Sequence, residues 1–178
     1  GKLITNRVFR DPSAWYNLTF VWDTANAISS ERMIIYVNGV RETSFNTATY
    51  PSLNVDSGGA GRASSDIRIG TYYAIAGTFF DGYMANIVYI DNGALDASSF
   101  GETNDNGIWI PKDVSGLTFG TRGFYIDGRD ASDLGDDESG NGNDFVSGLS
   151  AHDQMADSPT NNFCTINSVY ADVTGANN

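Results

Sequence analysis

Apolar and polar residues alternate along several short stretches of this chain, with the period of two that is typical of β-strands. The clearest stretch runs from Tyr83 to Ile90, where both faces carry apolar side chains, so we expect a strand well inside a sheet. Asp91-Asn92-Gly93 then predicts a sharp turn, and Asp96 predicts a capped single helical turn. The segment from Phe79 to Gly101 therefore indicates a framework element.

A second alternating stretch runs from Tyr16 to Trp22. We expect one face of it on the core and the other in water. The core face would carry Tyr16, Leu18, Phe20 and Trp22, and the water face Asn17, Thr19 and Val21. Met33 to Phe45 predicts a hairpin, because Asn38-Gly39 supplies two residues that tolerate positive φ.

Shorter patterns predict strands at Leu3–Arg10, Asp66–Gly70 and Gly123–Asp127. Regular short strands, frequent turns and almost no helical pattern predict an all-β fold, an antiparallel β-sandwich. Residues 1–167 are expected to form one domain, because this length suits a single core. Residues 168–178 have little to bury and indicate a tail or a linker to a further domain.

Charge and cysteine content remove several classes of function. The chain has 22 acidic and 10 basic residues, a net charge of −12, and such a surface repels phosphate backbones, so we expect no nucleic-acid partner. No window is apolar over the length of a bilayer, so we expect no membrane insertion. Cys164 is the only cysteine, which excludes an internal disulfide and a thiolate metal site.

The stretch from Asp127 to Asp144 is the richest in acidic residues. Carboxylates interleaved with Gly, Asn and Ser can supply the roughly six to eight oxygens that Ca²⁺ prefers, although the spacing is not that of an EF-hand. The candidate calcium ligands are Asp136, Asp137, Asn141, Asn143 and Asp144. The alternative is an Asx-type turn in which these side chains bond their own backbone. Both interpretations stay open at this point.

The order of several segments resembles that in laminin-G-like, concanavalin A-like lectin/glucanase domains. These segments are WYNLTFVWDT, RMIIYVNGVRETSF, IRIG and FFDGYMANIVYIDNGALDASSFG. More narrowly, IDNGALDASSFGE, GIWIPKDVSGLTFGTRGFYIDG, DESGNGNDF and DSPTNNFCTIN look like the version found in tail-associated proteins of bacteriophages, especially marine phages. The resemblance covers Arg10 to Asn167 and implies a jelly-roll sandwich.

The resemblance also sets an expectation about the first strands. In that family several strands precede the segment that matches Phe9 to Pro12, and here only about ten residues do. We therefore expect the N-terminal strands to be missing from this chain, or to be supplied by another segment or chain. A sandwich without them exposes an unpaired edge. We accordingly expect a larger, multi-subunit assembly.

A glycan site is what the resemblance implies, because an aromatic face can stack on a sugar. The candidate glycan-binding residues are Trp109, Tyr72, Tyr73 and Tyr50. For each of them the alternative is a packing aromatic, since aromatic residues dominate small cores.

Enzymatic activity is not expected. Laminarinase-type relatives carry a Glu-x-Asp-x-x-Glu pattern, and none of the four glutamates here lies in that spacing. His152 is the only histidine, and no nucleophile elbow accompanies it.

The resemblance implies a non-catalytic domain on the virion surface, in a tail fibre or appendage. There it would attach to host-surface polysaccharide as a homo-oligomer beside other tail subunits. Two alternatives remain: an architectural domain that decorates a particle or joins subunits, and a glycan depolymerase.

Overall fold

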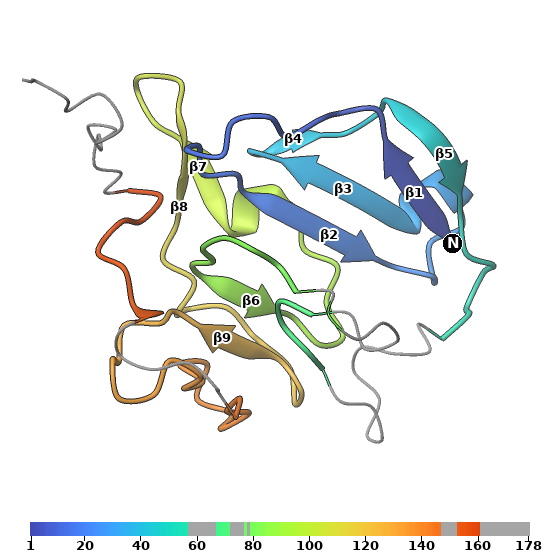
Figure 1. Cartoon of the computed structure of the whole chain (residues 1–178). Coiled ribbons are helices and arrows are strands. Elements are labelled where there is room, and N and C mark those ends of the chain that lie inside the picture. The colour runs from blue at the N-terminus through green and yellow to red at the C-terminus, as the bar shows by residue number, and fades with distance from the viewer. Residues whose placement is uncertain (57–66, 72–76, 78, 147–152, 161–178) are drawn as a thin grey trace, which may run out of the picture.

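The computed structural model describes residues 1–56, 67–71, 77, 79–146 and 153–160 (Figure 1). This part consists of short strands, turns and two single-turn 3₁₀ helices, η1 (Ser29–Glu31) and η2 (Ala97–Ser99). All strand pairs are antiparallel, so the predicted all-β class is confirmed. No helix within the described ranges could span a bilayer.

The largest sheet has the strand order β2-β3-β4, with β2 (Leu18–Trp22), β3 (Met33–Val37) and β4 (Val40–Arg41). The predicted hairpin is confirmed at its turn, where Asn38 and Gly39 have φ of 48° and 75°. Both are positive, as a two-residue hairpin turn requires. The second strand ends at Arg41, and the chain then leaves this sheet.

A separate two-stranded sheet joins β1 (Lys2–Thr5) to β5 (Phe45–Thr49), with an irregularity between Ile4 and Thr5. The predicted strand Leu3–Arg10 therefore ends early. Arg7 Nε lies 2.7 Å from Glu42 Oε2, which ties the end of β1 to the end of β4. The β1-β5 sheet also meets the β2-β3-β4 sheet near Gly1, where an added Cβ would collide with Met33 Sδ.

Two further pairs join β6 (Ile87–Tyr89) to β9 (Phe124–Ile126), and β7 (Gly101–Thr103) to β8 (Trp109–Pro111). The buried apolar residues of the described part are Val37, Ala97, Val114, Phe119, Phe124 and Ile126. Phe124 and Ile126 belong to β9, and Phe119 stacks on Tyr125 of the same strand at 6.4 Å. The Phe124 ring stacks on Tyr89 at 5.5 Å and meets Phe145 edge-on at 4.8 Å, so a large part of the core lies at β9.

The predicted strand from Tyr83 to Ile90 is mostly wrong, because only Ile87–Tyr89 is a strand. Asn86 has a φ of 52°, a left-handed conformation that Asn tolerates and that interrupts a ladder. Tyr83 and Met84 are 60% and 44% exposed. The capped turn after it is confirmed, since Asp96 Oδ1 accepts from Ser98 N at 3.0 Å.

The other short-strand predictions have different outcomes. Of the predicted strand Asp66–Gly70, the described residues 67–70 form no strand, and Thr71 only bridges Phe79. The predicted strand Gly123–Asp127 is confirmed in its centre as β9.

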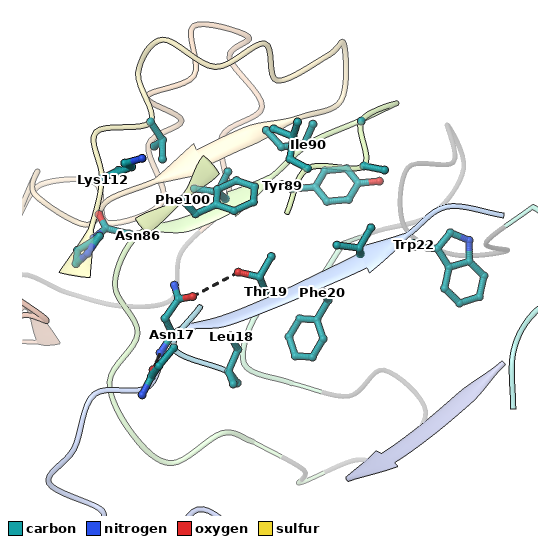
Figure 2. Close-up of a pocket in the computed structure, with 18 of the residues that line it drawn as sticks. Asn17, Leu18, Thr19, Phe20, Trp22, Asn86, Tyr89, Ile90, Phe100 and Lys112 are labelled. Carbon is teal, nitrogen blue, oxygen red and sulfur yellow. Dashed lines mark hydrogen bonds between the residues drawn. The ribbon is translucent and has the colours of Figure 1, made fainter. Parts of the chain in front are cut away.

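The predicted sidedness of β2 is also wrong. Leu18, Phe20 and Trp22 are 46%, 68% and 40% exposed, whereas Thr19 is only 7% exposed. Met33 of β3 lies opposite Trp22 and shares its face, and β1 covers that face at Met33. Because β2 is the outer strand of the sheet, its apolar side chains lie beyond this cover. Figure 2 shows Thr19 pointing towards Phe100, and Leu18 and Phe20 pointing away. We call Leu18, Phe20 and Trp22 the β2 strip.

Candidate functional site

A groove with a volume of about 1790 Å³ separates β2 from the segment around β6 (Figure 2). One wall is formed by the residues from Ala14 to Ala25, and the opposite wall by Ala85, Asn86 and Val88 to Leu95 together with Phe100 and Lys112. Pockets for single small molecules are usually about 300–1,000 Å³. The groove is therefore large enough for an extended ligand.

Asparagine amides supply polar groups on both walls of the groove. Asn17 Oδ1 accepts from Thr19 Oγ1 at 3.4 Å, Asn38 Oδ1 accepts from Asn17 N at 2.8 Å, and Asn86 Oδ1 accepts from Tyr125 OH at 3.0 Å. These contacts engage the amide oxygens, whereas the NH₂ groups of the three asparagines bond no other described residue. The groove therefore offers hydrogen-bond donors.

Tyr89 and Phe100 add aromatic surface to the wall opposite β2. Tyr89 is held by its stacking on Phe124. Burial raises the pKa of the Tyr89 phenol, and the nearby Asp91 carboxylate raises it further against the opposing effect of Arg122. The phenol therefore keeps its proton at neutral pH and can donate a hydrogen bond.

Lys112 is the cation that Figure 2 shows at one end of the groove. Its Nζ donates to Ser98 O at 3.2 Å and lies 3.6 Å from Glu102 Oε2. The side chain is 41% exposed, so water screens this ion pair. Lys112 can therefore also reach an acceptor on a ligand.

Of the predicted glycan-binding aromatics, the described structure places Trp109 in the groove wall. Its indole packs against Gly39 of the hairpin turn and Gly101 of β7. The geometry thus favours the packing interpretation of Trp109. Tyr50 is half-buried and lies outside the groove lining, and Tyr72 and Tyr73 lie outside the described residues.

The acidic loop is organised by Asp137, which is 7% exposed. Its Oδ1 accepts from Tyr125 N at 2.8 Å and Ser139 N at 2.9 Å. Its Oδ2 accepts from Asn143 N at 2.9 Å and Ser139 Oγ at 2.8 Å. Burial alone would raise the pKa of Asp137, but these hydrogen bonds outweigh it and hold the pKa below its ordinary value.

The other candidate calcium ligands also bond the backbone. Asn141 Nδ2 donates to Gly120 O at 2.7 Å, Asn143 Nδ2 to Gly123 O at 2.9 Å, and Asp144 Oδ1 accepts from Asp137 N at 3.1 Å. Asp136 is exposed beside them. Of the bonds in this loop, the one from Ser139 N to Asp137 Oδ1, two residues apart, is that of the Asx-type alternative, whereas the Asn141 and Asn143 amides tie the loop to Gly120 and Gly123.

Calcium binding by this loop stays a prediction. Among the described residues no group of three or more His, Cys, Asp or Glu could hold a metal ion. His152 and Cys164, which the sequence singles out, lie outside the described residues.

Sequence patterns alone did not identify the groove residues Asn17, Asn86, Tyr89, Phe100 and Lys112. Asn17 was assigned to a solvent face, and Asn86 and Tyr89 to a framework strand. One signal was present, because an Asn inside an otherwise apolar alternation favours a local left-handed residue rather than a continuous strand.

Comparisons with protein-family models, curated proteins and solved structures each found no match to this chain.

Proposed function

We propose that this chain is a non-catalytic carbohydrate-binding domain with a jelly-roll, concanavalin A-like arrangement, carried on the surface of a phage particle. The observation that supports it best is the groove, where amide donors and aromatic rings line a space larger in volume than a single small molecule needs. Sugars present hydroxyl acceptors and apolar ring faces, which such a surface complements.

The virion location is supported by the order of sequence segments described above. A tail fibre or appendage that repeats the domain would add weak sites together, because linked binding events gain avidity without new contacts. Host-surface polysaccharide, itself a repeating ligand, is the partner that this mechanism requires.

Binding can be tested with a glycan array probed by the intact, oligomeric protein. Tyr89→Phe removes one phenol from the groove, and losing a neutral hydrogen bond should weaken sugar affinity roughly 2–10-fold. Tyr83→Phe is the matched control, because Tyr83 is 60% exposed and lies outside the groove lining. An absence of binding at millimolar sugar would refute the attachment role.

An architectural role is the second candidate, and the β2 strip is the observation that favours it. Three exposed apolar side chains in a row on one strand are typical of surfaces that meet another protein. In this alternative the domain decorates a particle or joins subunits and needs no sugar.

A further inference from the structure

The β2 strip combines exposed apolar side chains with an absence of charge. Phe20 at its centre is 68% exposed, and Leu18 and Trp22 on either side are 46% and 40% exposed. The run from Ala14 to Trp22 contains no charged residue, in a chain of net charge −12. Edge strands are usually protected by charge. This one lacks that protection.

Part of the backbone of β2 points away from its partner strand β3. Asn38 N donates to Asn17 O at 2.9 Å, and Asp23 N donates to Arg32 O at 2.9 Å. With Leu18 opposite Val37, these two bonds show that the odd-numbered residues of β2 bond β3. The N–H and C=O groups of Leu18, Phe20 and Trp22 therefore point to the outer edge, where no described strand pairs with them.

We propose that a second copy of this chain pairs with β2 along this edge, antiparallel and about a two-fold axis at Phe20. In that register Phe20 lies opposite Phe20, and Leu18 lies opposite Trp22 of the other copy. Residues that lie opposite each other share a face, so every exposed apolar side chain meets an apolar one. The strip is thus complementary to itself, as a two-fold interface requires.

The pairing would join the two three-stranded sheets into one with the strand order β4-β3-β2-β2-β3-β4. Thr19 stays on the groove side, because its side chain points to the face opposite the strip (Figure 2). Leu18, Phe20 and Trp22 also belong to the groove wall, so the dimer is tested in the absence of sugar. A chain that dimerises and binds no glycan contradicts only the proposed function, and a chain that binds glycan as a monomer contradicts only the dimer.

The exposed area indicates a weak dimer. Fully covered aromatic side chains bury about 150–250 Å² each, so at the observed exposures the strip and its backbone offer on the order of 400 Å² per copy. The total of roughly 800 Å² lies below the ~1,200 Å² of standard interfaces. We expect a Kd on the order of tens of micromolar, decreasing with added salt because each copy carries −12.

Sedimentation velocity of the full chain from about 1 to 500 µM tests the dimer. Phe20→Lys would place two ammonium groups opposite each other, so we expect the Kd to rise at least about 10-fold. Val40→Lys is the control, because Val40 is 63% exposed on β4, away from the outer edge of β2. A wild-type chain that stays monomeric to 500 µM, or a Phe20→Lys dimer as tight as wild type, overturns the proposal.

Hydrogen exchange of the wild-type amides provides a second test that needs no variant. Thr19 and Val21 bond β3, so their amides should be protected at every protein concentration. The amides of Leu18, Phe20 and Trp22 should gain protection only as dimer forms. Fast exchange of these three in a dimer would show another interface. Equal protection at low concentration would show that the edge is already paired within one chain. Either result overturns the proposal.

Discussion

Replacing Asp137 by Asn should destabilise the fold strongly, because this side chain holds its own loop together and connects the loop to β9. Its two oxygens accept from the N–H groups of Tyr125, Ser139 and Asn143 and from the Ser139 hydroxyl. Tyr125 belongs to β9, next to the buried Phe124. The carboxylate thus anchors the acidic loop to the centre of the core.

The magnitude follows from what Asn can offer in the same position. Asn keeps one oxygen, so its NH₂ group must face two of the four donors. The Ser139 hydroxyl can rotate and accept, but at least one backbone N–H remains unpaired whichever way the amide is oriented. Hydrogen bonds to a charged group contribute about 1.5–3 kcal/mol, and a buried unpaired donor costs about 1–3 kcal/mol. We expect a loss of about 3 kcal/mol at pH 7, or roughly 6–12 °C in Tm for a chain of this size.

The contribution of the Asp137 charge to the free energy of unfolding depends on pH. The pKa of Asp137 is lowered in the folded state, so its contribution is present above the ordinary Asp pKa and is lost as pH falls through the folded pKa. The difference in the free energy of unfolding between wild type and Asp137→Asn should therefore be largest at pH 7 and should decrease in acid.

Thermal and urea unfolding at pH 7 and at pH 3 would measure this gap. Asp130→Asn is the matched control, because Asp130 also accepts from a following serine, at 2.8 Å from Ser132 N and 2.6 Å from Ser132 Oγ, but is exposed. We expect a much smaller change there. Equal effects of the two substitutions, or an Asp137→Asn gap that does not change with pH, would refute the reasoning.

Two other predictions concern the hairpin turn and the acidic loop. Gly39→Ala should cost about 2–4 kcal/mol in urea unfolding, because φ is +75° and the new methyl would collide with the Trp109 indole. Gly107→Ala is its control, since φ is +76° with open space around it, and a similar cost at both sites would contradict the role of Trp109. N–H and O–H donors already bond both oxygens of the Asp137 carboxylate, so neither oxygen is open to a cation. Ca²⁺ added after EDTA should therefore leave Tm unchanged within about 1 °C. A rise of several degrees that grows with Ca²⁺ concentration would instead support the predicted five-residue calcium site.

Local features were predictable because neighbouring residues determine them. Asn38-Gly39 forms its turn wherever the hairpin lies, since both residues tolerate positive φ. Asp96 caps η2 through a bond two residues away. The all-β class follows from the same short-range patterns.

The candidate site was far less predictable. Asn17 and Asn86 are 69 positions apart in the sequence, and only the fold places them on one groove. Trp109 was predicted as a candidate for sugar stacking, but its surroundings depend on Gly101 of the paired strand β7 and on Gly39, which comes from the β3-β4 hairpin turn. The acidic loop was partly predictable. Its residues suggested either calcium or Asx turns, but the spacing did not reveal the hydrogen bond from the distant Tyr125 N to Asp137.

By itself, therefore, the sequence determined the strand class, the turns and the caps, because φ and ψ preferences act over a few residues. Tertiary structure alone decided which face of β2 is covered. Alternation shows that Leu18, Phe20 and Trp22 share a face, but burial depends on what packs against that face. Here β1 meets that face at Met33 of β3, and β2 lies beyond it as the outer strand, so its apolar side chains stay exposed. Thr19, on the opposite face, points towards Phe100 and is buried.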